Sequence, residues 1–161
     1  MLQKESNTEQ VELSIIVPIY NGEEYIQNKI ASLKDIENLS YEVIISLNVC
    51  NDKSEKLLDV FINGSPNFKI VKQTNFLPGL ENYIRGFNVA KGSFIMASAV
   101  DDMCEKDFYR EAIDLLNNSN EIVAVSPLSS FVDNSHGDKP IDFELLGSTE
   151  ERLRTLFSNI R

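Results

Sequence analysis

The chain of 161 residues is 42% hydrophobic, which is enough to bury one sizeable core but hardly two. Its formal net charge of -10 at pH 7 would repel nucleic acid and anionic membrane surfaces, and its 15 Lys and Arg residues are scattered. No apolar stretch approaches the ~18 residues that a membrane-spanning helix needs. We therefore predict a single domain that neither binds nucleic acid nor spans a membrane.

The first predicted elements follow a polar tail. Residues 1–12 lack the apolar segment of a secretory signal, which predicts a cytoplasmic location, either free or at the inner face of the membrane. The apolar run from Leu13 to Val17, broken by Pro18, is typical of a strand covered on both faces, as in a parallel sheet. A helix should follow, because Asn21-x-x-Glu24 resembles a capping box and apolar residues recur at helical spacing at Tyr25, Ile26, Ile30 and Leu33.

The alternation of strand and helix repeats. Glu42 to Leu47 predicts a second strand, and Asp52-x-x-Glu55 opens a helix whose buried side would carry Leu57, Leu58, Phe61 and Ile62. A short strand is predicted around Lys69 to Lys72, followed by a third helix with an apolar stripe of Leu80, Tyr83, Ile84 and Phe87. Cys50 and Cys104 show no paired spacing and are predicted to be free thiols.

The last third of the chain continues the pattern. Phe94 to Ala99 predicts a fourth strand, Glu105 to Leu116 a helix and Ile122 to Val125 a fifth strand. Residues 133–142 are polar and predict a loop. A final helix opened by Ser148-x-x-Glu151 would carry an apolar stripe of Leu153, Leu156, Phe157 and Ile160. Such alternation predicts βαβ units, with ligands at the carboxyl ends of the strands.

The segment from Ser14 to Tyr25, SIIVPIYNGEEY, resembles the opening of family-2 glycosyltransferases. The resemblance covers residues 13 to 126 and implies a GT-A fold, which is a Rossmann-like α/β domain with a mostly parallel sheet flanked by helices. We therefore expect one GT-A domain over residues 13–161, with the nucleotide-sugar-binding half present and the acceptor half cut short. The resemblance places Pro18, Ile19, Tyr20 and Glu24 at the nucleotide-sugar. Tyr20 could stack on a base, or be a core residue with Glu24 as a helix cap.

Two further segments resemble the family in the donor-binding half. Asn48 occupies the position of the family's base-reading carboxylate, and its amide can pair with the edge of a base. As an alternative, Asn48 is simply a turn residue. Arg85 is the candidate for the family's diphosphate-binding arginine, and the alternative is a solvated helix residue.

The segment from Phe94 to Asp102 resembles the strand that ends in the family's D-x-D element. The resemblance makes Asp102 a ligand of Mn²⁺ or Mg²⁺ and places Asp101 near the ribose. Carboxylates suit these ions, which bind through one or two carboxylates plus substrate phosphates. Asp102-x-x-Glu105 could instead be a helix capping box. His136 could complete a metal site or be an ordinary surface histidine.

Together these segments predict transfer of a sugar from a nucleotide-diphosphate-sugar to a glycan or lipid-linked acceptor in cell-surface polysaccharide synthesis. Inversion at the sugar needs a general base, and no segment after Asp102 matches the family's base motif, so the catalytic residue is left unassigned. The carboxylates available there are Asp133, Asp138, Asp142 and Glu144. The alternative is a non-catalytic nucleotide-sugar-binding or regulatory module. An uncovered final helix would favour a homo-oligomer.

Overall fold

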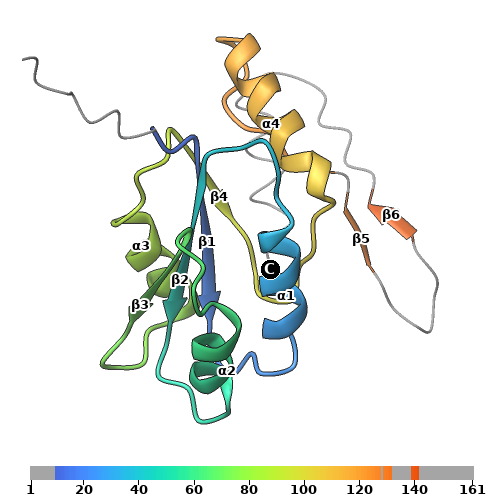
Figure 1. The fold of residues 1–161 in the computed structure, drawn as a ribbon. Coiled ribbons are helices and arrows are strands. Elements are labelled where there is room, and N and C mark those ends of the chain that lie inside the picture. The colour runs from blue at the N-terminus through green and yellow to red at the C-terminus, as the bar shows by residue number, and fades with distance from the viewer. Residues whose placement is uncertain (1–9, 128, 132–138, 142–161) are drawn as a thin grey trace, which may run out of the picture. The chain divides into compact units, whose positions relative to one another are not determined.

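The computed structural model describes residues 10–127, 129–131 and 139–141 (Figure 1). The chain divides into two compact units, Met1–Val125 and Ser126–Arg161. In the second unit, β5 (Ser129–Phe131) and β6 (Lys139–Ile141) pair as antiparallel strands. The expected site residues that the structure describes all belong to the first unit.

The first unit is a parallel sheet flanked by helices, as predicted. Its elements are β1 (Leu13–Ile19), α1 (Ile26–Lys34), β2 (Tyr41–Leu47), α2 (Ser54–Phe61), β3 (Phe68–Lys72), α3 (Gly79–Phe87), β4 (Phe94–Ala97) and α4 (Lys106–Asn118). The strand order is β3-β2-β1-β4, and every pairing is parallel. From β1 the chain adds β2 and β3 on one side and then crosses back to add β4 on the other side of β1. The strand order therefore reverses at β1.

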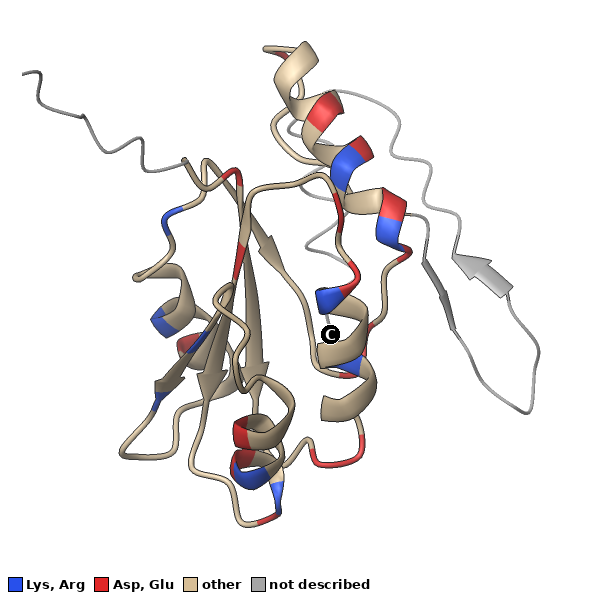
Figure 2. Ribbon diagram, viewed as in Figure 1, with Lys and Arg blue, Asp and Glu red and all other residues tan. Residues whose placement is uncertain are grey.

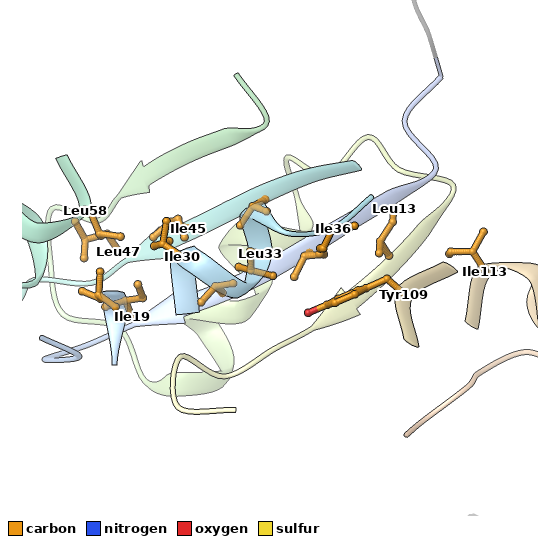
Figure 3. Close-up of a cluster of buried hydrophobic side chains, with 14 residues drawn as sticks. Leu13, Ile19, Ile30, Leu33, Ile36, Ile45, Leu47, Leu58, Tyr109 and Ile113 are labelled. Carbon is orange, nitrogen blue, oxygen red and sulfur yellow. The ribbon is translucent and has the colours of Figure 1, made fainter. Parts of the chain in front are cut away.

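One face of the sheet carries the hydrophobic core beneath α1 (Figure 3). Alternate residues of β1 and β2 point to this face, because successive side chains of a strand alternate. They pack against the apolar stripe of α1, against Leu58 of α2, and against Tyr109 and Ile113 of α4. Burial of these side chains is the main favourable contribution to the fold, at about 25 cal/mol per Å² of apolar surface.

The opposite face of the sheet is covered by α3, which packs differently from the prediction. Its buried residues are Asn82 and Gly86, whereas Leu80 is 72% exposed and Ile84 is 43% exposed. The Ser46 hydroxyl donates to Asn82 Oδ1 (2.8 Å), and Asn82 Nδ2 donates to the Ser46 carbonyl (3.0 Å). The predicted apolar stripe of α3 is therefore only half right, since Tyr83 and Phe87 are half-buried.

The predicted capping boxes before α1 and α4 are wrong, and the one before α2 forms only in part. Asn21 has a φ of 51°, in the left-handed region, and α1 begins only at Ile26 without a side-chain cap. No side-chain cap is present at α4 either. At α2 the prediction is partly right, because Asp52 Oδ1 accepts from the Ser54 N–H (2.9 Å), although Glu55 does not complete the box and accepts from Lys72 instead. Asn21 Oδ1 and Asp52 Oδ2 bind neighbouring loops.

The predicted strand Ile122 to Val125 is also wrong, because these residues have no regular structure and Val123 is 92% exposed. An apolar run forms a strand only where another strand offers hydrogen bonds. The final helix with its stripe of Leu153, Leu156, Phe157 and Ile160 lies outside the described residues, as does most of the predicted loop 133–142.

The surface of the described residues agrees with the composition. Lys and Arg are dispersed among Asp and Glu over the helices and loops of the first unit (Figure 2). Among the described helices, none has both the length and the apolar character to cross a bilayer. Cys50 and Cys104 are free thiols, as predicted.

Candidate functional site

The candidate site lies at the carboxyl end of the sheet, between β1 and β4. Pairing of β1 with β4 ends at Ile16 and Ala97, where the Ser98 N–H donates to the Ile16 carbonyl (3.0 Å). Pro18 is the next β1 residue that faces β4, and it has no N–H to continue the ladder. With β2, in contrast, β1 stays paired to Ile19 and Leu47. Pro18 therefore ends the pairing at the point where open α/β sheets bind their ligands.

Tyr20 follows β1 directly and is half-exposed at this edge. Its ring makes an edge-to-face contact with Phe76, with 5.0 Å between ring centroids and an interplanar angle of 71°. Tyr20 is 50% exposed and Phe76 is 58% exposed, so much of both rings remains open to a ligand. Tyr20 is not a core residue, and the alternative that made it one is wrong.

Asn48 follows β2 and holds the loop that carries Phe76. Its Nδ2 donates to the Leu77 carbonyl (2.7 Å), while the Leu77 N–H donates to Asn48 Oδ1 (3.0 Å). Oδ1 also accepts from the Val49 N–H (3.1 Å), and the side chain is 4% exposed. These bonds leave one Nδ2 hydrogen for a ligand. The base-reading role of Asn48 stays a prediction, and the structure adds a positioning role.

The loops after β1 and β2 are joined by reciprocal hydrogen bonds. The Glu23 N–H donates to Asp52 Oδ2 (3.0 Å), and the Lys53 N–H donates to Glu23 Oε2 (2.9 Å). The Gly22 N–H donates to the Ser54 hydroxyl (2.9 Å). Burial opposes ionisation of Asp52, but the hydrogen bonds from Ser54 and Glu23 outweigh it, and the pKa of Asp52 is lowered. These bonds fix the backbone next to Tyr20.

Asp101 and Asp102 follow β4 in an exposed turn, which we call the acidic turn and define as residues 99–102. The Asp102 N–H donates to the Ala99 carbonyl (3.3 Å). Among the described residues, neither carboxylate makes an ion pair or a side-chain hydrogen bond, so Asp102 does not cap α4. The capping alternative for Asp102 is therefore wrong, and both carboxylates are available to a ligand.

One contact and one electrostatic effect relate the acidic turn to other parts of the site. A Cβ placed on Gly22 would lie 3.3 Å from Val100 Cγ1, so the β1–α1 loop touches the acidic turn. Burial raises the pKa of Tyr83 on α3, and the negative charges of Asp102 and Asp101 raise it further. The acidic turn thus lies next to the loop after β1 and within electrostatic range of α3.

Lys29 is a residue of this region that the sequence analysis missed. It lies on the buried side of α1, is 1% exposed, and its Nζ donates to the Ser98 hydroxyl (2.6 Å). Burial lowers the pKa of Lys29, against the opposing effects of Cys104, Asp102 and Asp101. The signal was available, because Lys29 falls between Ile26 and Leu33 on the apolar stripe of the helix.

The remaining predicted site residues are not held by such contacts. Glu24 and Arg85 are exposed, and the structure shows no ion pair for either among the described residues. Their roles stay predictions. His136, Asp133, Asp138, Asp142 and Glu144 lie outside the described residues.

A separate pocket of about 160 Å³ lies between α4 and the loop that follows α1. Its lining mixes both charges, from Glu37, Asn38, Lys106, Asp107, Arg110 and Glu111. Arg110 is already bound to Glu12 (3.4 Å) and to Asp114 (2.9 Å). This pocket is not part of the carboxyl edge, and its arginine is already paired with carboxylates outside the lining.

The residues at the carboxyl edge can support a metal ion that is shared with a ligand. No group of three His, Cys, Asp or Glu side chains that could hold a metal occurs among the described residues. Two adjacent free carboxylates nevertheless fit Mg²⁺ or Mn²⁺, which complete their coordination with phosphate and water oxygens. Fold and edge together define an α/β domain of the class in which ligands bind at the carboxyl ends of parallel strands.

The chain belongs to glycosyl transferase family 2, because the family's profile matches residues 14–161. The abequosyltransferase RfbV of Salmonella typhimurium is 31% identical over 99 residues, which cover 59% of this chain and 29% of RfbV. EpsH of Bacillus subtilis is 26% identical over 122 residues, which cover 75% of this chain and 35% of EpsH. The matched parts thus span about a third of each relative.

Solved structures confirm the GT-A fold. The crystal structure of S. aureus TarS 1-349 superposes with a TM-score of 0.62 at 22% identity, covering 67% of this chain and 33% of that one. The same TarS fragment has been solved in complex with UDP-GlcNAc, and it matches this chain with a TM-score of 0.62. At this level of identity the likeness concerns the fold.

Proposed function

We propose that this chain binds a nucleotide-diphosphate-sugar at the carboxyl edge of its sheet, as the donor-binding part of an inverting glycosyltransferase. The observation that carries the proposal is the end of the pairing between β1 and β4, with the half-exposed Tyr20 ring after one strand and two free carboxylates after the other. Family membership and the UDP-GlcNAc complex of TarS support the choice of ligand.

Each side chain has a distinct part in donor binding. Tyr20 and Phe76 offer aromatic surface on which a base can stack, worth ~1–3 kcal/mol per base. Asp102 would hold Mn²⁺ or Mg²⁺, and Asp101 would lie near the ribose. A bound metal neutralises the leaving diphosphate without consuming a proton. Pro18, Ile19, Glu24, Asn48 and Arg85 are proposed as further donor contacts.

The acceptor is proposed to be a glycan or a lipid-linked sugar in cell-surface polysaccharide synthesis, on the cytoplasmic side of the membrane. RfbV is named as an abequosyltransferase, which supports sugar transfer as the reaction. An inverting transfer also needs a general base at the acceptor hydroxyl, which typically contributes ~10² to 10⁴-fold to the rate. We expect this chain alone to bind donor and to transfer sugar slowly.

Calorimetry with UDP-GlcNAc and other nucleotide-sugars, with Mn²⁺ and with chelator, tests the proposal. We expect at least tenfold tighter binding with Mn²⁺, and a loss of this difference in Asp102→Asn. Asp59→Asn is the matched control, because Asp59 is an exposed carboxylate on α2, away from the edge. Equal affinity with metal and with chelator would refute the metal role, and no binding of any nucleotide-sugar would refute the function.

Tyr20→Ala tests the stacking surface. We expect a five- to hundredfold weaker binding of nucleotide, in line with ~1–3 kcal/mol for one stacked base. Tyr25→Ala is the control, since Tyr25 is 46% exposed and Tyr20 is 50% exposed, yet Tyr25 lies before α1 rather than against Phe76. An equal effect of both variants would show that Tyr20 does not contact the base.

An assay for nucleotide release distinguishes the proposed glycosyltransferase from the alternative, a nucleotide-sugar-binding module without catalytic activity. The measurement uses the whole chain with UDP-GlcNAc, Mn²⁺ and a set of glycan and lipid-linked acceptors. Release that depends on an acceptor shows transfer. Tight donor binding without acceptor-dependent release favours the module.

A further inference from the structure

Lys29 is a buried ammonium group that contacts Ser98, directly before the acidic turn, and Asp102, at the end of the turn. Its Nζ donates to the hydroxyl of Ser98, which is 3% exposed at the end of β4. It also donates to the main-chain carbonyl of Asp102 (2.5 Å). The turn is otherwise closed by one backbone hydrogen bond of 3.3 Å, from Asp102 to Ala99. Lys29 is therefore the strongest described contact that closes the turn.

The partners of Lys29 are as informative as its burial. No carboxylate lies within ion-pair distance of Nζ among the described residues, although Asp101 and Asp102 are close enough to act on it electrostatically. The lysine thus binds the backbone of the acidic turn and leaves the oxygen atoms of both carboxylates free. An ion pair would have occupied the oxygens that a divalent cation needs.

A lysine is a costly residue for this position. Burial of an ammonium group costs several kcal/mol unless hydrogen bonds compensate. Methionine or leucine would fill a similar space on the apolar stripe of α1 without that cost. What lysine adds is a pair of charge-assisted hydrogen bonds to the turn, and these are about twice as strong as neutral ones.

The core packing of α1 makes the lysine a rigid support. Ile26, Ile30 and Leu33 on the same stripe are each no more than 2% exposed. Nζ is therefore held by a helix that cannot shift without opening the core. Through Lys29, the position of the acidic turn is set by the core of the domain.

We propose that Lys29 is a positioning residue that holds the acidic turn in the geometry in which Asp101 and Asp102 bind a metal ion and a nucleoside diphosphate. This inference rests on the proposed function for its ligand, but the structural part does not. Removal of the ammonium group should loosen the turn and weaken metal-dependent binding, while binding without metal changes little.

The variant Lys29→Met keeps the aliphatic volume and removes both hydrogen bonds. Lys34→Met is the matched control, since Lys34 lies on the same helix and its Nζ donates to the Phe61 carbonyl (2.6 Å), away from the acidic turn. Ser98→Ala removes one partner of Lys29 without touching the lysine. Urea denaturation of each variant establishes that it is folded.

The first measurement is amide hydrogen exchange over residues 99–104 in the ligand-free chain. We expect at least tenfold faster exchange in Lys29→Met, a smaller increase in Ser98→Ala, and no change in Lys34→Met. Unchanged exchange in Lys29→Met would overturn the inference, whether or not the chain binds nucleotide.

The second measurement is the binding of UDP as a function of Mn²⁺ concentration. We expect Lys29→Met to need at least tenfold more Mn²⁺ for half-maximal UDP binding, with affinity in chelator unchanged. In an Asp102→Asn background, Lys29→Met should change the affinity less than twofold, because the two residues act on the same metal. A purely structural role would weaken binding with and without Mn²⁺ alike, and that result would overturn the proposal.

These outcomes separate the two proposals. If the unmodified chain binds UDP in Mn²⁺ and Lys29→Met binds it equally well, the function stands and the role of Lys29 fails. If the unmodified chain binds no nucleotide, the proposed function fails, and the exchange rates alone decide whether Lys29 holds the turn.

Discussion

Gly86→Ala should destabilise the domain, although alanine is the better helix former. Gly86 lies inside α3, where Gly→Ala by itself is worth about 1 kcal/mol in favour of alanine. The helix, however, lies so close to β1 that a Cβ on Gly86 would overlap the Cγ2 methyl of Ile16. One of these effects must outweigh the other, and the geometry decides which.

The overlap is far inside the range of ordinary contact, which begins at 3.4 Å. Ile16 is fully buried in the central strand of the sheet and cannot move aside without displacing its neighbours. Overpacking of a tight core typically costs ~1–3 kcal/mol, and an overlap of this depth falls in the upper half of that range. After the gain in helix propensity, we expect a net loss of about 1–2 kcal/mol.

Urea denaturation monitored by circular dichroism measures this loss. Gly79→Ala is the control within the same helix, because a Cβ on Gly79 would meet nothing within 4 Å, and it should not destabilise. Ile16→Leu removes the Cγ2 methyl at similar volume. The double variant Ile16→Leu/Gly86→Ala should therefore be at least about 1 kcal/mol more stable than the sum of the two single-variant losses predicts. A Gly86→Ala variant as stable as Gly79→Ala would refute the reasoning.

Three further predictions concern the loops of the site. Asn48→Asp places a carboxylate oxygen where Nδ2 now donates to the Leu77 carbonyl, and it should lower the free energy of unfolding, measured in urea, by about 1–3 kcal/mol. A variant as stable as the native chain would show that this hydrogen bond does not stabilise the fold. Because the pKa of Asp52 is lowered in the folded protein, its carboxylate stabilises the fold above pH ~4, and this contribution is lost as the pH falls through the folded pKa. In urea titrations, Asp52→Asn should therefore be less stable than the native chain at pH 7, and the difference should shrink at lower pH. A difference in stability that does not change with pH would contradict this prediction. Burial raises the pKa of the Cys50 thiol, which accepts a hydrogen bond from the Asn21 N–H (3.3 Å). Alkylation of Cys50 at pH 8 should therefore be slower in the folded protein than in the urea-unfolded protein, and equal rates would refute this prediction.

The four strands and four helices of the first unit, and their carboxyl edge, could be predicted from the sequence because each rests on local patterns. Apolar runs gave β1, β2 and β4, and residues just after such runs fall at the carboxyl edge of a parallel sheet. Asp102 was predicted at this edge for that reason, and the structure leaves its carboxylate free there.

The side that α3 turns to the sheet could not be predicted, because apolar content is not what decides it. A buried polar pair, Asn82 with Ser46, and a small residue over Ile16 determine the contact. Hydrophobic periodicity favours Leu80 and Ile84, and it carries no information about the sheet face that lies opposite.

The capping box at Asn21 failed for a related reason. Asn21 Oδ1 accepts a hydrogen bond from a loop about 30 residues away, and this bond competes with the local cap. Lys29 was missed because a single lysine on a helix is usually solvated, and its partners at Ser98 and Asp102 lie about 70 residues away in the sequence.

The position of β1 between β2 and β4 has a consequence for the order of folding. Leu13 pairs with Tyr41, about 30 residues further along the chain, and with Phe94, about 80 residues further along. Loop closure makes the second pairing about 1 kcal/mol more costly in chain entropy. We infer that β1, β2 and β3 assemble first and that β4 docks last, carrying the acidic turn with it. A nucleotide bound at the β1–β4 junction would then act chiefly by slowing the departure of β4, and its effect should appear in the unfolding rate rather than in the folding rate.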